Sequence, residues 1–178
     1  MTHPSDPRAP LPLLITGIAG VAGYNALHYF RSKYGSRVVG IRQRDNWRLQ
    51  DPGAAPCDLE DSTGIRRLFE KHRFAAVLNC AGNCALRACE LDSRLAWRTN
   101  VEGLTSLLSV VIERRVRLVH LSVDLVFSGA SGNGGYVETN RPDPVTVYGK
   151  TMVAAEQLIL DLADKLHDLQ LSSASGAR

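Results

Sequence analysis

The stretch Leu13–Gly23, which reads LLITGIAGVAG, constrains the fold of this chain more than any other feature. An apolar run of strand length ends in a glycine, two further glycines follow at intervals of three, and a segment with helical spacing begins. In nucleotide-binding folds, a strand, glycine loop and helix in this order bring backbone N–H groups to phosphate. We therefore predict dinucleotide binding here, with a purely structural turn as the alternative. The candidate residues are Gly17, Gly20, Val21, Ala22 and Gly23.

Further apolar runs have the length of buried strands, and segments with helical spacing separate them. Strands are predicted at 11–17, 37–41, 74–79 and 117–123. Helices are predicted at 18–35, up to His72 from an N-cap at Asp61 or Ser62, from about Asp92 to Arg114, and at 144–159. Loops are predicted at 42–56 and 128–140. Strands that are apolar throughout need cover on both faces, so the pattern indicates a parallel sheet between helices. This is the doubly wound α/β architecture of the Rossmann type.

The length of 178 residues allows one domain with a full hydrophobic core. We expect a nucleotide-binding domain at 11–165, an N-terminal tail at 1–10 and a polar C-terminal tail at 166–178, in which LHDLQLSS is at best a weak strand. The content of 44% hydrophobic and 22% charged residues is typical of a soluble globular protein. No apolar run is long enough to cross a bilayer, and the N-terminus lacks the pattern of a secretion signal. We therefore expect a cytoplasmic protein without a membrane partner.

The charge and the cysteines narrow the function classes further. The net charge is +3, but the basic residues are scattered among acidic ones or stand in short pairs, which argues against a nucleic-acid surface. The cysteines match no zinc-binding spacing, and no histidine lies near them in the sequence. They are Cys57, Cys80, Cys84 and Cys89. We expect free, mostly buried thiols in a reducing compartment, with a metal site as the alternative.

The end of the second predicted strand bears on the choice of cofactor. Many folds of this type place an acidic residue there, which binds the adenine ribose and selects NAD. This chain has Arg42 and Arg44 instead, in the sequence GIRQR. A guanidinium suits a 2′-phosphate, so the pattern favours NADP over NAD. In the alternative, both arginines are solvated and bind no ligand.

Together these motifs resemble the extended short-chain dehydrogenase/reductase superfamily, and within it the dTDP-4-dehydrorhamnose reductase branch. The matching segments follow the family order from Leu13 to Ile159: TGIAGVAG, CDLED, VLNCAGNCALRACELD, TNVEG, VHLSVDLVFSG and YVETNRPDPVTVYGKTMVAAEQLI. The resemblance implies that Asp58 and Leu59 border the adenine and that Tyr148 lies beside the nicotinamide as the catalytic residue. It also implies a further set of cofactor-binding residues, namely Cys80, Ala81, Gly82 and Asn100.

The resemblance implies three acid–base groups: a Ser or Thr hydroxyl at the end of the fourth strand, a tyrosine, and a lysine four residues after the tyrosine. Here Tyr148 is present, but Val123 occupies the hydroxyl position and Met152 the lysine position. Lys150 is two residues after Tyr148, about 200° around a helix, and so cannot replace the lysine. Ser122 is next to Val123, but neighbouring side chains on a strand point to opposite faces.

Two interpretations of function follow. In the first, the chain is an NADP- or NAD-dependent reductase of a keto-sugar nucleotide, impaired by the two missing groups. In the second, it is a non-catalytic NADP-binding protein similar to the regulatory subunit of methionine adenosyltransferase. A purely structural domain is a third alternative. The resemblance also implies a C-terminal substrate-binding portion, which we expect to be missing. The chain is then a fragment or a shortened form, or it depends on a protein partner, and we expect the isolated chain to self-associate.

Overall fold

The computed structural model describes residues 10–130 and 134–175. Positions 1–9 of the expected N-terminal tail, 131–133 of the expected loop and 176–178 of the expected C-terminal tail lie outside the described residues. The chain divides into two compact units, Met1–Gly82 with Ser109–Leu121 and Asn83–Leu108 with Ser122–Arg178. Within the described residues, no helix is long and apolar enough to cross a membrane.

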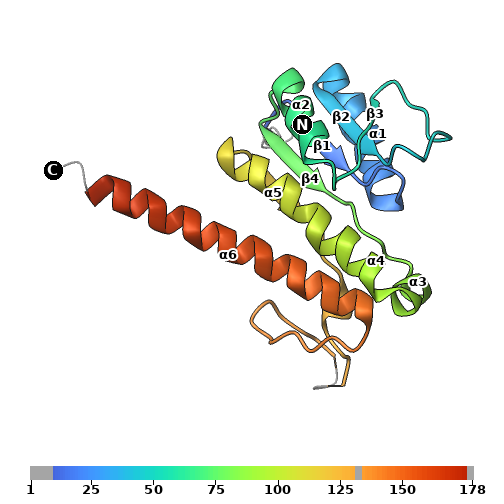
Figure 1. Cartoon of the computed structure of the whole chain (residues 1–178), viewed down its shortest axis with the longest axis vertical. Coiled ribbons are helices and arrows are strands. Elements are labelled where there is room, and N and C mark those ends of the chain that lie inside the picture. Colours follow the sequence, from blue (N-terminus) through green and yellow to red (C-terminus); the bar gives the residue numbers. More distant parts are fainter. Residues whose placement is uncertain (1–9, 131–133, 176–178) are drawn as a thin grey trace, which may run out of the picture. The chain divides into compact units, whose positions relative to one another are not determined.

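The first unit contains a parallel sheet of five strands in the order β3-β2-β1-β4-β5 (Figure 1). The central strand β1 has Leu14 in register with Val39 on one side and with Val77 on the other. The strand order runs outward from β1 in both directions, as in a doubly wound α/β fold, and this confirms the predicted architecture. The strands are β1 Leu13–Thr16, β2 Val38–Arg42, β3 Ala54–Pro56, β4 Ala76–Asn79 and β5 Arg117–His120.

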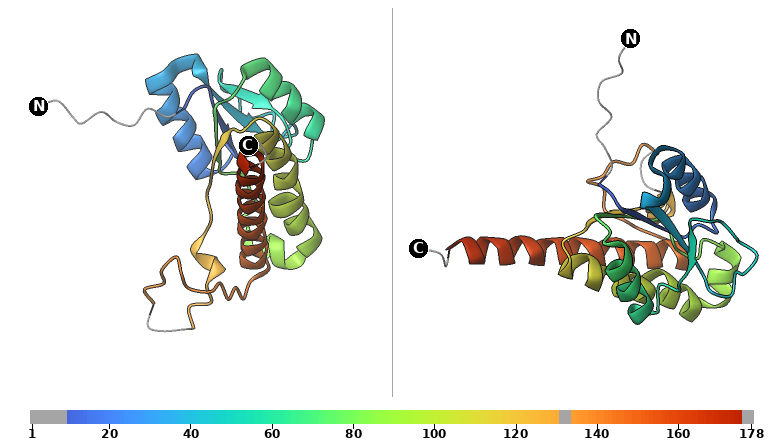
Figure 2. Two further views of the ribbon diagram at one scale, coloured as in Figure 1. Left: turned by 90° about the vertical axis from the view of Figure 1, so that its left-hand side faces the viewer. Right: turned by 90° about the horizontal axis from the view of Figure 1, so that it is seen from above.

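Helices cover both faces of this sheet (Figure 2). α1, Val21–Tyr34, connects β1 to β2, and the turn η1, Gly35–Arg37, follows it. α2, Ser62–His72, connects β3 to β4 on the opposite face. Of the two predicted N-caps of α2, Asp61 is the one used, because its carboxylate accepts a hydrogen bond from the Gly64 N–H at 2.8 Å.

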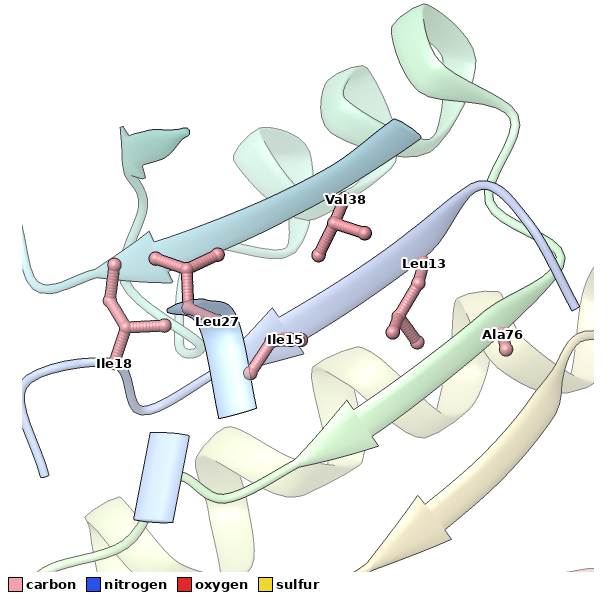
Figure 3. Close-up of a cluster of buried hydrophobic side chains, with 6 residues drawn as sticks. All are labelled: Leu13, Ile15, Ile18, Leu27, Val38 and Ala76. Carbon is pink, nitrogen blue, oxygen red and sulfur yellow. The ribbon is translucent and has the colours of Figure 1, made fainter. Parts of the chain in front are cut away.

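Apolar side chains from three strands and α1 form a core against one face of the sheet (Figure 3). Ile18 belongs to the glycine loop and Leu27 to α1, and both are at most 1% exposed. Burying such a side chain stabilises the fold by about 1.5–3 kcal/mol, so this core fixes the loop and the helix to the sheet. The cluster consists of Leu13, Ile15, Ile18, Leu27, Val38 and Ala76.

The second unit is mainly helical. α6 packs against α3, α4, η2 and η3 around an apolar cluster. The cluster consists of Cys89, Ala96, Val126, Tyr148 and Met152. The elements are α3 Leu86–Leu91, α4 Ser93–Trp97, the π-helical turn η2 Arg98–Glu102, the 3₁₀ turn η3 Asp124–Val126 and α6 Val147–Ser175. α5, Gly103–Glu113, begins in this unit and ends in the first.

Several predicted elements need correction. β3 lies in a stretch that we expected to be a loop, because its small residues and proline become a strand only by pairing with β2. β5 ends at His120, three residues earlier than predicted. The stretch predicted as one helix from about Asp92 is α4, η2 and α5 in succession. LHDLQLSS is part of α6 and not a strand.

Candidate functional site

The candidate cofactor and catalytic residues fall into two groups, one in each compact unit. The helical unit contains Asn100 and Tyr148, together with Val123 and Met152. The sheet unit contains Gly17, Gly20, Val21, Ala22, Gly23, Arg42, Arg44, Asp58, Leu59, Cys80, Ala81 and Gly82.

The glycine loop joins the carboxyl end of β1 to α1, and its three glycines meet three different demands. Gly17 has a φ of +67°, which L side chains rarely adopt, and a Cβ there would lie 2.5 Å from the Cys80 carbonyl oxygen. At Gly23, a Cβ would lie 2.4 Å from the Gly17 carbonyl oxygen. At Gly20, a Cβ would meet only the Gly17 oxygen, at 3.4 Å, so this side of the backbone is open.

The start of α1 fits an anionic ligand. Gly20 is the N-cap, no side chain caps the helix, and the first turn contains no acidic residue. The backbone N–H groups in the first turn of a helix have no intrahelical acceptor. In α1 these include the N–H groups of Val21 and Ala22. Val21 is 81% exposed, so its side chain leaves the start of the helix largely open. A tight turn, an open backbone and a close helix contact are the three features that a dinucleotide pyrophosphate requires.

The end of β4 lies directly beside the glycine loop. Thr16 Oγ1 accepts hydrogen bonds from the backbone N–H groups of Cys80 and Ala81, both at 3.2 Å. The Thr16 hydroxyl donates to the side-chain oxygen of Asn79. Thr16 and Asn79 are at most 1% exposed. Two of the segments predicted to contact the cofactor, the Gly17 turn and the backbone after β4, are therefore held together.

The two arginines after β2 have different partners. The Arg44 guanidinium pairs with the Asp61 carboxylate and lies 3.8 Å from the Asp58 carboxylate. Arg42 Nη1 donates to the Gln43 carbonyl oxygen at 3.0 Å, and Arg42 Nε is buried with no hydrogen-bond partner among the described residues. Arg42 also lines a cavity of about 450 Å³ beside the loop that precedes β3. Arg42 therefore retains capacity for an anionic ligand, whereas carboxylates already hold Arg44.

Asp58 and Leu59 follow β3 at the edge of the sheet where Arg42 ends β2. The Asp58 carboxylate accepts a hydrogen bond from the Arg44 backbone N–H at 3.0 Å. This bond ties the segment after β3 to the segment after β2. The two segments predicted to meet the adenosine part of the cofactor are therefore adjacent in the structure.

All four cysteines are free. Cys57 and Cys89 are buried, Cys80 is half-buried and Cys84 is exposed. Burial raises the pKa of the Cys57 and Cys80 thiols to about 11. These two thiols are neutral at physiological pH and are poor nucleophiles.

Tyr148 lies in the first turn of α6, within the apolar cluster of the helical unit. Its side chain is 7% exposed, and that of Met152, one turn later, is 4% exposed. Val123 packs against the same cluster. Lys150 is exposed, as expected for a residue on another face of the helix. Apolar groups therefore surround Tyr148 where the family pattern has a hydroxyl and an ammonium group.

The environment of Tyr148 favours its protonated form. Burial raises the pKa of the phenol above its ordinary value, and the nearby Cys84, Cys89 and Asp124 raise it further because their charged forms are anions. Within the described part of the chain, the groups that shift this pKa include no cation. Tyr148 is therefore a neutral phenol at physiological pH, able to donate a proton but not to accept one.

Ser122 and Val123 both belong to the helical unit and have different partners there. The strand that we expected to run through both residues ends at His120, so their opposite directions stay a prediction. Val123 packs against the cluster around Tyr148, while the Ser122 hydroxyl donates to the Glu156 carboxylate. Glu156 is about two helical turns after Tyr148. The Ser122 hydroxyl is therefore engaged at a different point on α6.

Asn100 lies in the π-helical turn η2 and is 4% exposed. Its amide nitrogen donates to Thr151 Oγ1 at 2.9 Å, and its side-chain oxygen accepts from the Asn83 N–H at 2.6 Å. The Thr151 hydroxyl donates in turn to the Tyr148 carbonyl oxygen at 2.7 Å. Asn100 therefore connects Asn83 to the first turn of α6. Its contact with a cofactor stays a prediction.

Three polar residues that hold these groups together, Thr16, Asn79 and Thr151, were not among the predicted site residues. Thr16 and Asn79 each end an apolar strand, and Thr151 is 0% exposed within the tyrosine helix. A polar residue as the last member of a buried strand is the signal that could have revealed the first two. The amphipathic pattern of α6 alone does not distinguish Thr151 from a solvated residue.

Comparison with known proteins finds relatives that are named as dTDP-sugar reductases. A family model described as "RmlD substrate binding domain" matches residues 11–171. A dTDP-4-keto-6-deoxy-D-glucose reductase from Streptomyces niveus is 33% identical over 149 residues, which cover 84% of this chain and 47% of the relative. A dTDP-4-dehydrorhamnose reductase from Streptomyces griseus is 32% identical over 149 residues, which cover 84% and 45%. The chain thus spans about half the length of these curated relatives.

Solved structures also align with the chain. A hypothetical dTDP-4-dehydrorhamnose reductase from Sulfolobus tokodaii aligns with a TM-score of 0.71 at 26% identity, over 82% of this chain and 50% of that one. An L-threonine dehydrogenase from Phytophthora infestans aligns with a TM-score of 0.78 at 23% identity, over 87% and 50%, and this likeness shows the fold alone. Since the family model matches most of its residues, the chain belongs to the RmlD substrate binding domain family.

Proposed function

We propose that this chain binds NADP or NAD and acts as a slow reductase of a keto-sugar nucleotide. One observation carries the proposal: the Gly17 turn lies so close to the backbone of Cys80 and Ala81 that a Cβ on Gly17 would be 2.6 Å from the Ala81 nitrogen, while Gly20 leaves an open approach to α1. This geometry suits a pyrophosphate. The relatives named above are reductases of dTDP-linked 4-keto sugars, which supports a substrate of that class.

NADP is the cofactor that we favour. Arg42 stands at the end of β2, its Nε lacks a partner among the described residues, and it lines the cavity beside β3. A guanidinium with free donors is suited to a 2′-phosphate. Arg44 supports this arrangement indirectly, because its pairing with Asp58 and Asp61 joins the segments after β2 and β3.

Tyr148 is the proton donor in this proposal. When bound, the nicotinamide supplies a hydride to the carbonyl carbon, and the Tyr148 phenol gives its proton to the carbonyl oxygen. The resulting phenolate would lie in an apolar cluster without an ammonium partner, where its charge is poorly stabilised. The proton transfer is therefore costly, and slow turnover follows.

A second candidate, a non-catalytic NADP-binding protein, is favoured by a specific observation. Met152 and Val123 pack against the cluster that contains Tyr148 and occupy the two positions that acid–base chemistry needs. In the sheet unit, the tight turn at Gly17, the close contact at Gly23 and the open backbone at Gly20 support cofactor binding. Binding without turnover is the outcome that this candidate predicts.

The same proposal includes a cytoplasmic location. It also includes self-association or binding to a protein partner. Val119, on the edge strand β5, and Leu121 after it are 47% and 42% exposed. Exposed apolar side chains at a sheet edge support association with another surface.

The proposal is tested by calorimetry of the chain with NADPH and NADH, followed by the rate of NADPH consumption with dTDP-4-keto-6-deoxyglucose. We expect binding of both cofactors and slow consumption that Tyr148→Phe abolishes, since that variant loses only the hydroxyl. If the wild type and Tyr148→Phe both bind the cofactor and neither consumes NADPH, the non-catalytic candidate is supported. A chain that binds neither cofactor would exclude both.

A further inference from the structure

Three polar residues form a row across the carboxyl ends of β1, β4 and β5. Thr16 is the last residue of β1, Asn79 of β4 and His120 of β5. The strand register pairs Thr16 with Asn79 and Asn79 with His120. The row therefore crosses three neighbouring strands at the edge of the sheet that precedes the glycine loop.

Hydrogen bonds fix the orientation of each member. The Asn79 side-chain oxygen accepts from the Thr16 hydroxyl and from the Ala81 N–H, the latter at 3.4 Å. The Asn79 amide nitrogen therefore faces His120, whose Nδ1 lies 2.7 Å away. Since an amide nitrogen only donates, Nδ1 must accept, and the proton of a neutral His120 ring is on Nε2. That Nε2 is buried and has no hydrogen-bond partner among the described residues.

The other end of the row contacts the candidate cofactor segments. Thr16 Oγ1 accepts from the Cys80 and Ala81 N–H groups at 3.2 Å, and Thr16 is followed by Gly17. Gly17 lies so close to this backbone that a Cβ would be 2.6 Å from the Ala81 nitrogen. The orientation of the Thr16 hydroxyl therefore determines how the backbone after β4 sits against the glycine turn.

We propose that His120 is a positioning residue for the dinucleotide, acting through Asn79 and Thr16. This inference rests on the proposed function. In its neutral form, His120 holds the Asn79 amide in the orientation that leaves the oxygen for Thr16 and Ala81. A protonated ring carries a hydrogen on Nδ1 that meets the Asn79 amide donor, and relief requires the amide to turn. The turned amide presents a donor to the Ala81 N–H, which loosens the backbone against Gly17.

The protonation state of His120 depends on its burial and on the charged groups around it. Burial lowers the pKa of the ring, so the neutral form prevails at physiological pH. Asn79 on β4 is uncharged, and burial raises the pKa of the following Cys80 thiol to about 11. In the part of α5 within this unit, Glu113 pairs with Arg66; Arg114, just after that helix, lies 3.7 Å from Glu70. On β5 itself, Arg117 is exposed.

Calorimetry of the full chain with NADPH at about pH 7.5 and about pH 5 tests the proposal. We expect wild-type affinity to fall in acid. His120→Gln keeps an acceptor but cannot be protonated, so its affinity should fall less than that of the wild type, the shared loss coming from protonation of the 2′-phosphate. His120→Leu removes the acceptor and should weaken binding about three- to tenfold at pH 7.5, the effect of one hydrogen bond. Val119→Ala, on the same strand, is the matched control and should bind as the wild type does.

Hydrogen exchange of the Cys80 and Ala81 amides gives a readout without cofactor. These amides should exchange faster in His120→Leu than in Val119→Ala. Unchanged NADPH binding in His120→Leu, or equal pH dependence in His120→Gln and the wild type, would overturn this inference but not the proposed function. If the wild type binds no dinucleotide at either pH, the proposed function and this inference both fail. The comparison of His120→Gln with the wild type decides the matter if His120→Leu does not fold.

Discussion

Met152 lies four residues after Tyr148 on the buried side of α6, and both side chains belong to one apolar cluster. Residues at this spacing are neighbours on a helix surface, so Met152 occupies the place from which an ammonium group would act on the phenol. A thioether cannot stabilise a phenolate, and burial raises the pKa of Tyr148. This pair of residues is the physical reason to expect slow proton transfer in the proposed reduction.

Restoring both missing groups should therefore accelerate the reaction. We expect Met152→Lys combined with Val123→Thr to raise the rate of keto-sugar reduction by about 10²-fold or more, since a positioned acid–base partner contributes 10² to 10⁴. The measurement is the initial rate of NADPH consumption with saturating substrate. Lys150→Ala should leave the rate unchanged because Lys150 is exposed on another face of α6.

Burial of the new lysine calls for a stability control. Position 152 is only 4% exposed, and an ionised group is costly there unless it is paired. Met152→Leu, which keeps the volume and adds no charge, is the matched variant and should alter neither rate nor melting temperature appreciably. Loss of activity in Lys150→Ala, with no gain in Met152→Lys, would show that Lys150 is the working lysine.

The pKa of Tyr148 predicts the pH dependence of the reduction. Burial holds this pKa above its ordinary value of about 10, so the phenol stays protonated from about pH 7 to about pH 9. We expect no alkaline loss of rate over this range in the wild type. The folded state favours the neutral phenol, so its contribution to stability is lost only as the pH rises above the ordinary pKa. In Met152→Lys the alkaline limb should move toward neutral pH, and a wild-type limb already near neutral would contradict this account.

Local signals explain which parts of the fold could be predicted. β1, β2 and α1 follow from apolar runs and glycine spacing, and the relation of Tyr148 to Met152 follows from the helical period. β3 could not be predicted in this way. Ala54–Pro56 has no strand pattern of its own and becomes a strand because Gly40 and Ala54, among others, pair in register.

The side-chain partners in the candidate site could not be predicted, because they depend on contacts between segments that are distant in the sequence. Arg42 and Arg44 have the same side chain and nearly the same position, yet Asp61, 17 residues away, engages only Arg44. The row of Thr16, Asn79 and His120 depends on the register of three strands, which no local pattern encodes. Single residues were therefore predictable where helix or strand periodicity decides, and their partners were not.

The unequal partners of the two arginines lead to an expected difference in cofactor preference. Arg42→Ala should lower the affinity for NADPH about 10- to 100-fold and leave that for NADH nearly unchanged, because a hydrogen bond to a charged group contributes about 1.5–3 kcal/mol. Arg44→Ala should have a smaller effect, since Asp58 and Asp61 already hold its guanidinium. The ratio of the two dissociation constants, measured by calorimetry, is the test. Equal ratios in the wild type and Arg42→Ala would refute it.

In the glycine loop, one glycine should matter mainly for stability and another mainly for cofactor binding. At Gly17 an alanine must adopt a φ of +67° and place its Cβ 2.5 Å from the Cys80 oxygen, so Gly17→Ala should lower the free energy of unfolding by at least about 1–3 kcal/mol. At Gly20 a Cβ meets only one atom, at 3.4 Å. Gly20→Ala should therefore melt near the wild-type temperature but bind NADPH more weakly, because the methyl group stands where a phosphate approaches.

Gly35→Ala provides the control for these two variants. Gly35 has a φ of +60° but nothing within 4 Å of a Cβ, so its alanine variant carries backbone strain without crowding and lies at the far end of α1. We expect Gly35→Ala to lose stability through strain alone, less than Gly17→Ala, and to bind NADPH as the wild type does once folded. Thermal melts and calorimetry on the three variants give the comparison. Wild-type affinity in Gly20→Ala would mean that no phosphate lies against this backbone, because the added methyl group would then have displaced nothing.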